Sequence, residues 1–106
     1  MEKWVLIVEV NCTDPAREQE FNDWYNNTHL PDMIELPSVV RATRYENLNP
    51  GEGDGKYFAV YEMAAADFDK AMDELAAHVK EKAEQGRMSS LMQVTRRVRA
   101  KQILSK

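Results

Sequence analysis

The segment from Lys3 to Asn11 constrains the fold more than any other part of the chain. Alternate residues of a β-strand face opposite sides of a sheet, and here both alternating sets are apolar as far as Glu9. The two sets are Trp4, Leu6, Val8 and Val10 on one side and Val5 and Ile7 on the other. Both faces of this strand are therefore predicted to be buried.

The periodicity of the remaining segments predicts the element order βαββαβ. The first helix begins at Thr13-Asp14-Pro15, where a capping oxygen precedes a proline. The other expected elements are a strand over 38–47, a turn-rich loop over 49–55, a strand over 57–63, a helix over 67–85 and a strand over 91–104. We expect one α+β domain over residues 1–106, with a ferredoxin-like, four-stranded antiparallel sheet and two helices on one face.

The end of the first helix is less regular than its start. Asn26 and Asn27 are weak helix formers, and Pro31 disfavours a helical conformation at Leu30. We therefore expect this helix to end near Asn26 and to be followed by a short irregular or single-turn connector over 29–37.

A single ferredoxin-like unit leaves one face of its sheet bare. Leaving Val5 and Ile7 in water would forgo roughly 1.5–3 kcal/mol for each side chain. A second copy laid across that face would bury them, so the sequence predicts a homodimer. Two sheets curled around a shared interior could also hold a small molecule.

Composition and charge narrow the class of partner. The net charge of −4 argues against nucleic acid, no apolar run reaches the ~18 residues of a membrane span, and no signal peptide is recognisable. Cys12 is the only cysteine, which favours the cytoplasm. After Glu84 the chain has six Lys and Arg residues and no acid. This basic strand could meet an anionic ligand or form a solvated edge strand.

The pattern Trp24-Tyr25-x-x-x-His29-x-Pro31, followed by Pro37 and Arg44-Tyr45, resembles the dimeric α/β-barrel superfamily, in particular its EthD-like and related small-molecule branches. Ser38 stands where glycine is common in such sequences. The resemblance implies a dimeric barrel. Members include cofactor-free monooxygenases, muconolactone-type isomerases, polyketide cyclases and haem-degrading enzymes, so fold alone does not choose an activity.

His29 is the main candidate for chemistry. Histidine has an unperturbed pKa near neutrality, and it can therefore accept and return a proton within one catalytic cycle. The competing interpretation is a helix cap, in which the imidazole binds carbonyls of the last helical turn.

Neighbours of His29 would complete such a site. Glu9 could pair with the imidazole, and Arg41 or Arg44 could hold an anion, depending on which face of their strand points inward. Cross-strand pairing with Glu62 is the alternative for these arginines. The catalytic candidates are His29, Glu9 and Arg41, and the candidate substrate-binding residues are Trp24, Tyr25, Arg44, Tyr45 and Tyr61. The tyrosines either orient an aromatic ligand or only pack.

Cofactor sites have little support in the sequence. His29-x-x-Asp32 lacks an evident third ligand, and we expect no metal. His78 is expected at the surface, although the resemblance to haem-degrading members also allows it as an axial haem ligand.

These patterns predict a small-molecule enzyme doing cofactor-independent acid–base chemistry of the lyase, isomerase or cyclase type. Its substrate would be an aromatic or enolisable anion, with His29 transferring the proton. The alternatives are a haem-dependent or cofactor-free monooxygenase, and a non-catalytic ligand-binding or oligomerisation module.

Overall fold

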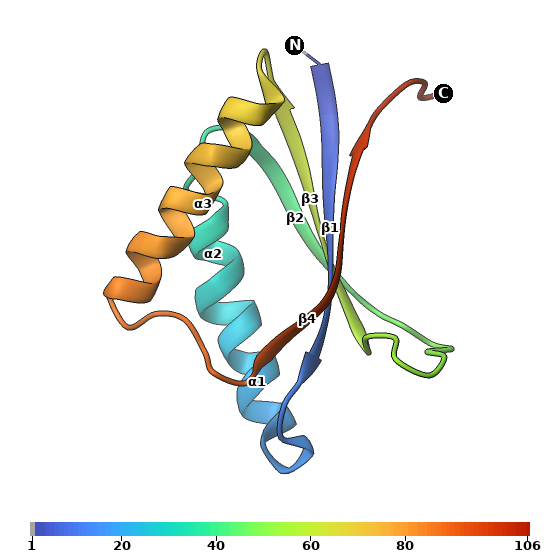
Figure 1. Ribbon diagram of the computed structural model, residues 1–106, viewed down its shortest axis with the longest axis vertical. Helices are drawn as coiled ribbons and strands as arrows, with labels where there is room; N and C mark the ends of the chain where they lie inside the picture. The colour runs from blue at the N-terminus through green and yellow to red at the C-terminus, as the bar shows by residue number, and fades with distance from the viewer. Residues whose placement is uncertain (1) are drawn as a thin grey trace.

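The computed structural model describes residues 2–106. In chain order its elements are β1 (Glu2–Cys12), η1 (Pro15–Arg17), α1 (Glu18–Trp24), η2 (Tyr25–His29), α2 (Leu30–Met33), β2 (Val39–Glu46), β3 (Tyr57–Ala65), α3 (Phe68–Glu84) and β4 (Met92–Lys101). The four strands form one antiparallel sheet in the order β2-β3-β1-β4. All helices lie on one face of this sheet (Figure 1). The predicted ferredoxin-like α+β fold is confirmed.

The helix starts follow local capping chemistry. The Asp14 carboxylate accepts a hydrogen bond from the Ala16 backbone N–H at 3.0 Å and caps η1, which leads into α1. The Asp67 carboxylate accepts from the Lys70 N–H and caps α3 in the same way. Both helix starts therefore lie where the sequence predicts them.

The end of the first helix differs from the sequence prediction. Helical structure continues from Glu18 through α1, η2 and α2 to Met33. The segment η2 is a π-helix, in which the Leu30 N–H donates to the Tyr25 carbonyl five residues earlier. In an α-helix the ring of Pro31 would clash with the carbonyl four residues back, and the wider π turn removes that conflict. The expected end of the helix near Asn26 is therefore corrected, because Leu30 keeps a helical conformation (φ −60°, ψ −47°). Of the two forms predicted for the connector, the single turn is the one observed, since α2 spans only Leu30–Met33.

The helix-facing side of the sheet forms the core. Leu6, Val8 and Val10 of β1 are buried together with Tyr61 of β3 and Phe21 of α1. Trp4 extends this core by stacking on the Phe68 ring of α3, with 4.3 Å between ring centroids.

The opposite face of the sheet carries no helix (Figure 1). Val5 and Ile7 of β1 pair there with Ala100 and Val98 of β4, and Ile7 also pairs with Val60 of β3. All five side chains are only partly buried. The apolar character of both faces of β1 is thus present in the structure, and we refer to this uncovered side as the outer face. No helix within residues 2–106 has the length and hydropathy needed to cross a membrane.

Candidate functional site

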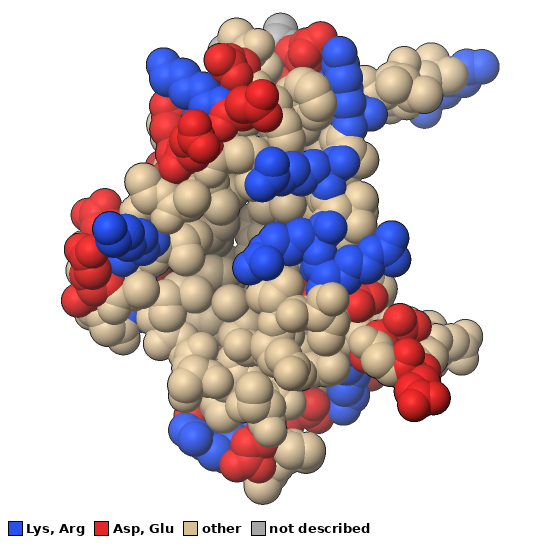
Figure 2. Space-filling view, in the orientation of Figure 1, with Lys and Arg blue, Asp and Glu red and all other residues tan. Residues whose placement is uncertain are grey.

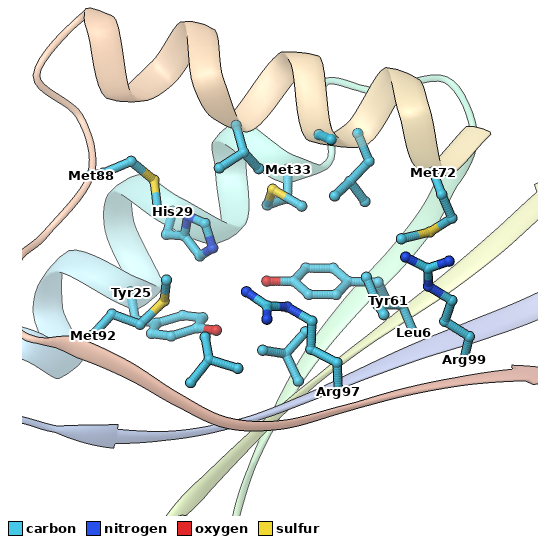
Figure 3. Close-up of a pocket in the computed structure, with 15 residues that line it drawn as sticks. Leu6, Tyr25, His29, Met33, Tyr61, Met72, Met88, Met92, Arg97 and Arg99 are labelled. Atoms are coloured by element: carbon cyan, nitrogen blue, oxygen red, sulfur yellow. The ribbon is translucent and has the colours of Figure 1, made fainter. Parts of the chain in front are cut away.

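A cavity of about 360 Å³ lies between the helix-facing side of the sheet and the helices. Four methionines contribute to its wall, and three polar residue types, Tyr, His and Arg, also reach it (Figure 3). The methionines are Met33, Met72, Met88 and Met92. Flexible thioether side chains adapt to ligand shape, and a mostly apolar wall with a few polar groups is typical of small-molecule sites.

The π turn of η2 positions His29 in the cavity wall. Its imidazole is 7% exposed and stacks on the Trp24 indole, with 4.9 Å between ring centroids and 19° between planes. The Trp24 Nε1–H in turn donates to the Arg87 carbonyl at 2.8 Å. The edge of the Tyr25 ring contacts His29 from another side, at 5.0 Å between centroids. The imidazole is therefore held by aromatic packing.

Burial determines the protonation state of His29. It lowers the pKa of the imidazole to about 4, with Asp32 opposing this shift and Arg44 adding to it. At neutral pH the ring is uncharged, with one N–H donor and one nitrogen lone pair that can accept a proton. The ring has no hydrogen-bond partner among residues 2–106, and His29 lies within continuous helix, so the helix-cap interpretation is wrong.

Two buried tyrosines face the same space as His29. Tyr25 and Tyr61 are 0% and 1% exposed, and within residues 2–106 no well-formed hydrogen bond satisfies either hydroxyl, although the two hydroxyls lie close enough to shift each other's pKa. Burial raises the pKa of both phenols, so the hydroxyls stay protonated and available as donors. An unmade buried hydrogen bond costs roughly 1–3 kcal/mol. The two hydroxyls point toward each other in Figure 3, and a ligand oxygen that accepts a hydrogen bond from either of them would offset that cost.

Arg44 lies behind this site. Its guanidinium carbon is 4.3 Å from the centre of the Tyr25 ring and 5.0 Å from that of Tyr57, and Nη1 donates to the Asn26 side chain at 2.9 Å. Such cation–π contacts stabilise a half-buried charge. Arg44 is on the helix-facing side as one expectation had it, but it is absent from the cavity wall and reaches the site only through the Tyr25 ring.

Three predicted site residues lie on the outer face instead. The Glu9 carboxylate accepts a hydrogen bond from the Thr95 hydroxyl at 2.6 Å. The Arg41 Nε lies 4.0 Å from a Glu62 carboxylate oxygen, and Tyr45 is more than half exposed. The expected grouping of Glu9, Arg41 and Tyr45 with His29 is corrected, because the strand alternation places them across the sheet from the cavity.

The two charged residues of the cavity wall were not among the predicted site residues. Arg97 and Arg99 of β4 line the cavity, and they pair in the sheet with Val8 and Leu6 of the helix-facing set. The sequence signal was present, because the basic C-terminal strand is compatible with an anionic ligand. The alternative interpretation, a solvated edge strand, does not take into account that Arg97 and Arg99, two residues apart, lie on the same face of the sheet.

Asp32 links α2 to α3 and to the segment that follows α3. Its carboxylate is 5% exposed and accepts two hydrogen bonds from the Arg87 guanidinium, at 2.7 and 2.9 Å. Its carbonyl lies 2.7 Å from the His78 Nε2 of α3. His78 does not line the cavity, so an axial haem contact through this residue has no geometric support. Within residues 2–106 no three His, Cys, Asp or Glu side chains gather in a metal-binding arrangement.

Replacing Arg87 by Gln should lower the free energy of unfolding by about 1–3 kcal/mol, because it leaves a buried carboxylate without its charged partner. Asp32→Asn in the same chain should recover part of that loss, since a neutral amide needs no counter-charge. Urea unfolding of the two single variants and the double variant measures the coupling. Additive losses would contradict a direct Asp32–Arg87 interaction.

Taken together, the sheet order, the helices on one face and the cavity between them define a ferredoxin-like domain. Solved structures of other proteins share this fold. The chain is similar to HapK from Hahella chejuensis, at 21% identity over 97% of this chain and 95% of that one, with a TM-score of 0.67. A dimeric ferredoxin-like protein from an uncultured marine organism matches at 12% identity over the whole of both chains, with a TM-score of 0.69. An EthD family protein from Bacillus halodurans C-125 matches at 20% identity over 97% and 100% of the two chains, with a TM-score of 0.55.

Similarity in sequence to known proteins covers less of the chain than similarity in structure. No protein-family model matches the chain. Core atranone cluster (CAC) protein 1 from Stachybotrys chlorohalonatus (strain IBT 40285) is 39% identical over 46 residues, which is 43% of this chain. The chain matches only 19% of the length of that protein. These similarities establish the fold and do not establish an activity.

Proposed function

We propose that the chain is a small-molecule enzyme that uses His29 for proton transfer on an aromatic or enolisable anion, in a reaction of the isomerase, lyase or cyclase type. The observation that carries this proposal is one cluster: a neutral buried imidazole and two neighbouring phenol hydroxyls, neither in a well-formed hydrogen bond, at the wall of a mostly apolar cavity. A base, phenol hydrogen-bond donors and a mostly apolar wall are the parts that enolisation needs.

The reaction would begin with a C–H bond next to a substrate carbonyl. The neutral His29 nitrogen takes the proton, and the electron pair of the broken bond moves onto the carbonyl oxygen. The Tyr25 and Tyr61 hydroxyls donate hydrogen bonds to the resulting enolate. His29 is a weak base in the empty cavity, but the enolate charge beside the ring would stabilise the imidazolium. Return of the proton to another atom completes an isomerisation, and loss of a leaving group completes an elimination. This scheme uses no cofactor.

His29→Phe should slow proton transfer about 100-fold or more, because a phenyl ring keeps the stack on Trp24 but has no basic nitrogen. The readout is deuterium uptake from heavy water by a panel of aromatic β-keto acids and 1,3-diketones, followed by NMR. His78→Gln is the matched control, since this histidine lies outside the cavity wall, and it should exchange at the wild-type rate. Binding of the panel with no exchange by the wild-type protein would instead identify a non-catalytic ligand-binding module.

The proposal includes a homodimer formed through the outer face. Val5, Ile7 and Val60 leave a partly exposed apolar surface there, and one structural neighbour is itself described as dimeric. Burying this surface against a second copy would recover the hydrophobic free energy that the protomer forgoes. The free thiol of Cys12 suits a reducing compartment, and we place the enzyme in the cytoplasm on that ground.

A further inference from the structure

Two guanidinium groups stand at the rim of the cavity without partners. Arg97 and Arg99 are alternate residues of the edge strand β4, so both side chains lie on the helix-facing side of the sheet. Both residues are exposed, and neither forms an ion pair with an acid within residues 2–106. Figure 3 shows the Arg97 guanidinium directed into the space that Tyr25 and Tyr61 face.

No acidic side chain of the cavity wall neutralises these two positive charges. No carboxylate lines the cavity, and no acid follows Glu84 in the chain. Figure 2 shows Lys and Arg side chains gathered beside a central hollow, with no acidic side chain between them and the hollow. Two like charges two residues apart on one face of a strand repel each other unless an anion lies between them.

The cavity wall also changes character along β4. Met92 and Val94 line it from the first half of the strand, and Arg97 and Arg99 line it from the second half. A ligand that matches this wall has an apolar body and a charged end. Arginine is suited to the charged end, because its planar donors pair with both oxygens of an acidic group.

We propose that Arg97 and Arg99 bind the acidic group of the substrate, so that the ligand is an amphiphilic aromatic acid. Its acidic group lies at the edge strand, and its ring lies among the methionines. The oxygen that reacts is then a separate group, placed at Tyr25 and Tyr61. This inference takes the location of the site from the proposed function. It narrows the proposed anion to an aromatic acid and adds the residues that select it.

Two fluorescent probes with the same ring system test the assignment. 8-Anilinonaphthalene-1-sulfonate carries an acidic group, and N-phenyl-1-naphthylamine is the neutral counterpart. The Arg97→Gln/Arg99→Gln double variant should bind the sulfonate at least about 10-fold more weakly, and the neutral probe within about 2-fold of wild type. Arg96→Gln is the matched control: this neighbouring residue pairs with Glu9 of the outer set and should leave both affinities unchanged.

Three results would overturn the inference. An equal loss for both probes in the double variant would mean that the arginines act through packing or folding. An equal loss of sulfonate binding in Arg96→Gln would mean that only the overall positive charge, or the outer face, attracts the anion. Unchanged binding of both probes to Ala76→Trp, which places an indole at the cavity wall, would mean that the probes bind elsewhere.

Failure of the proposed reaction is distinguishable from failure of this inference. Probe binding needs no turnover, so His29→Phe should retain the preference for the sulfonate over the neutral probe. Selective binding with no proton exchange would reject the enzyme and keep the acid-binding pair. Exchange without charge selectivity would reject the pair and keep the enzyme.

Discussion

Replacing Ile7 by Glu should convert the proposed dimer to a monomer. Ile7 lies on the outer face of the central strand β1, between Val60 of β3 and Val98 of β4. A carboxylate at this position can reach water in the monomer, but the proposed dimer would bury one from each protomer. Burying an unpaired charge costs several kcal/mol. A penalty of about 4 kcal/mol weakens the dimer roughly 1,000-fold.

Sedimentation velocity between about 1 and 50 µM protein would measure this shift. The protomer should tolerate the substitution, because the Ile7 side chain is only partly buried and a carboxylate there can reach water. Circular dichroism at matched concentrations checks that the fold is retained. Ala77→Glu on the exposed surface of α3 adds the same charge away from the outer face and should remain dimeric. A wild-type protein that sediments as a monomer throughout this range would remove the basis for the dimer.

The order of elements was predictable because each element has its own hydrophobic period. The alternation in β1 and the 3.6-residue period of α3 are local properties of the sequence, and the caps at Asp14 and Asp67 mark where helices begin. The end of the first helix was not predictable in this way. Pro31 ends an α-helix by its local preference, but a single π turn before it accommodates the ring. That turn depends on packing of Tyr25 and His29 that short-range propensities do not contain.

The face of the sheet on which each arginine side chain lies could not be predicted, for a different reason. Two β-bulges shift the alternation, one between Val39 and Arg41 and one opposite Glu9 and Val10. Each bulge inserts one residue and moves all later side chains of its strand to the other face. Arg97 and Arg99 consequently share a face with Val94. A sequence without its pairing partners does not reveal where such an insertion falls.

The candidate site was predicted in part for the same reasons. The helical spacing places Trp24, Tyr25 and His29 near one another, and the structure brings these three rings into contact. Tyr61 joins them because β3 pairs with β1 through a regular register. Glu9 was assigned to the site by placing the site on the face of Val5 and Ile7. The side of Arg41 was left open by the alternation of a strand that carries a bulge. The structure separates both residues from His29.

Acidification from pH 7.5 to pH 4 should destabilise the wild-type protein more than a His29→Phe variant. Burial lowers the pKa of His29 from 6.5 to about 4 in the folded state. Between these two values the unfolded chain binds a proton that the folded protein does not, so stability falls as pH falls through this window. The loss is complete below about pH 4 and amounts to about 3 kcal/mol.

Among His29 and the groups around it, His29 accounts for most of the loss of stability expected in this pH window. The Arg87 guanidinium lowers the pKa of Asp32 below its ordinary 3.8, so the stability that this carboxylate contributes is lost only below the window. Urea unfolding at one fixed protein concentration, in steps from pH 7.5 to 4, gives the curve for each variant and keeps dimerisation constant. Arg44→Met removes the cation that adds to the shift and should narrow the window without abolishing it, because burial is the larger cause. Parallel pH curves for wild type and His29→Phe would mean that the imidazole is hydrated in solution, and a hydrated imidazole would not supply the neutral, buried base on which proton transfer depends.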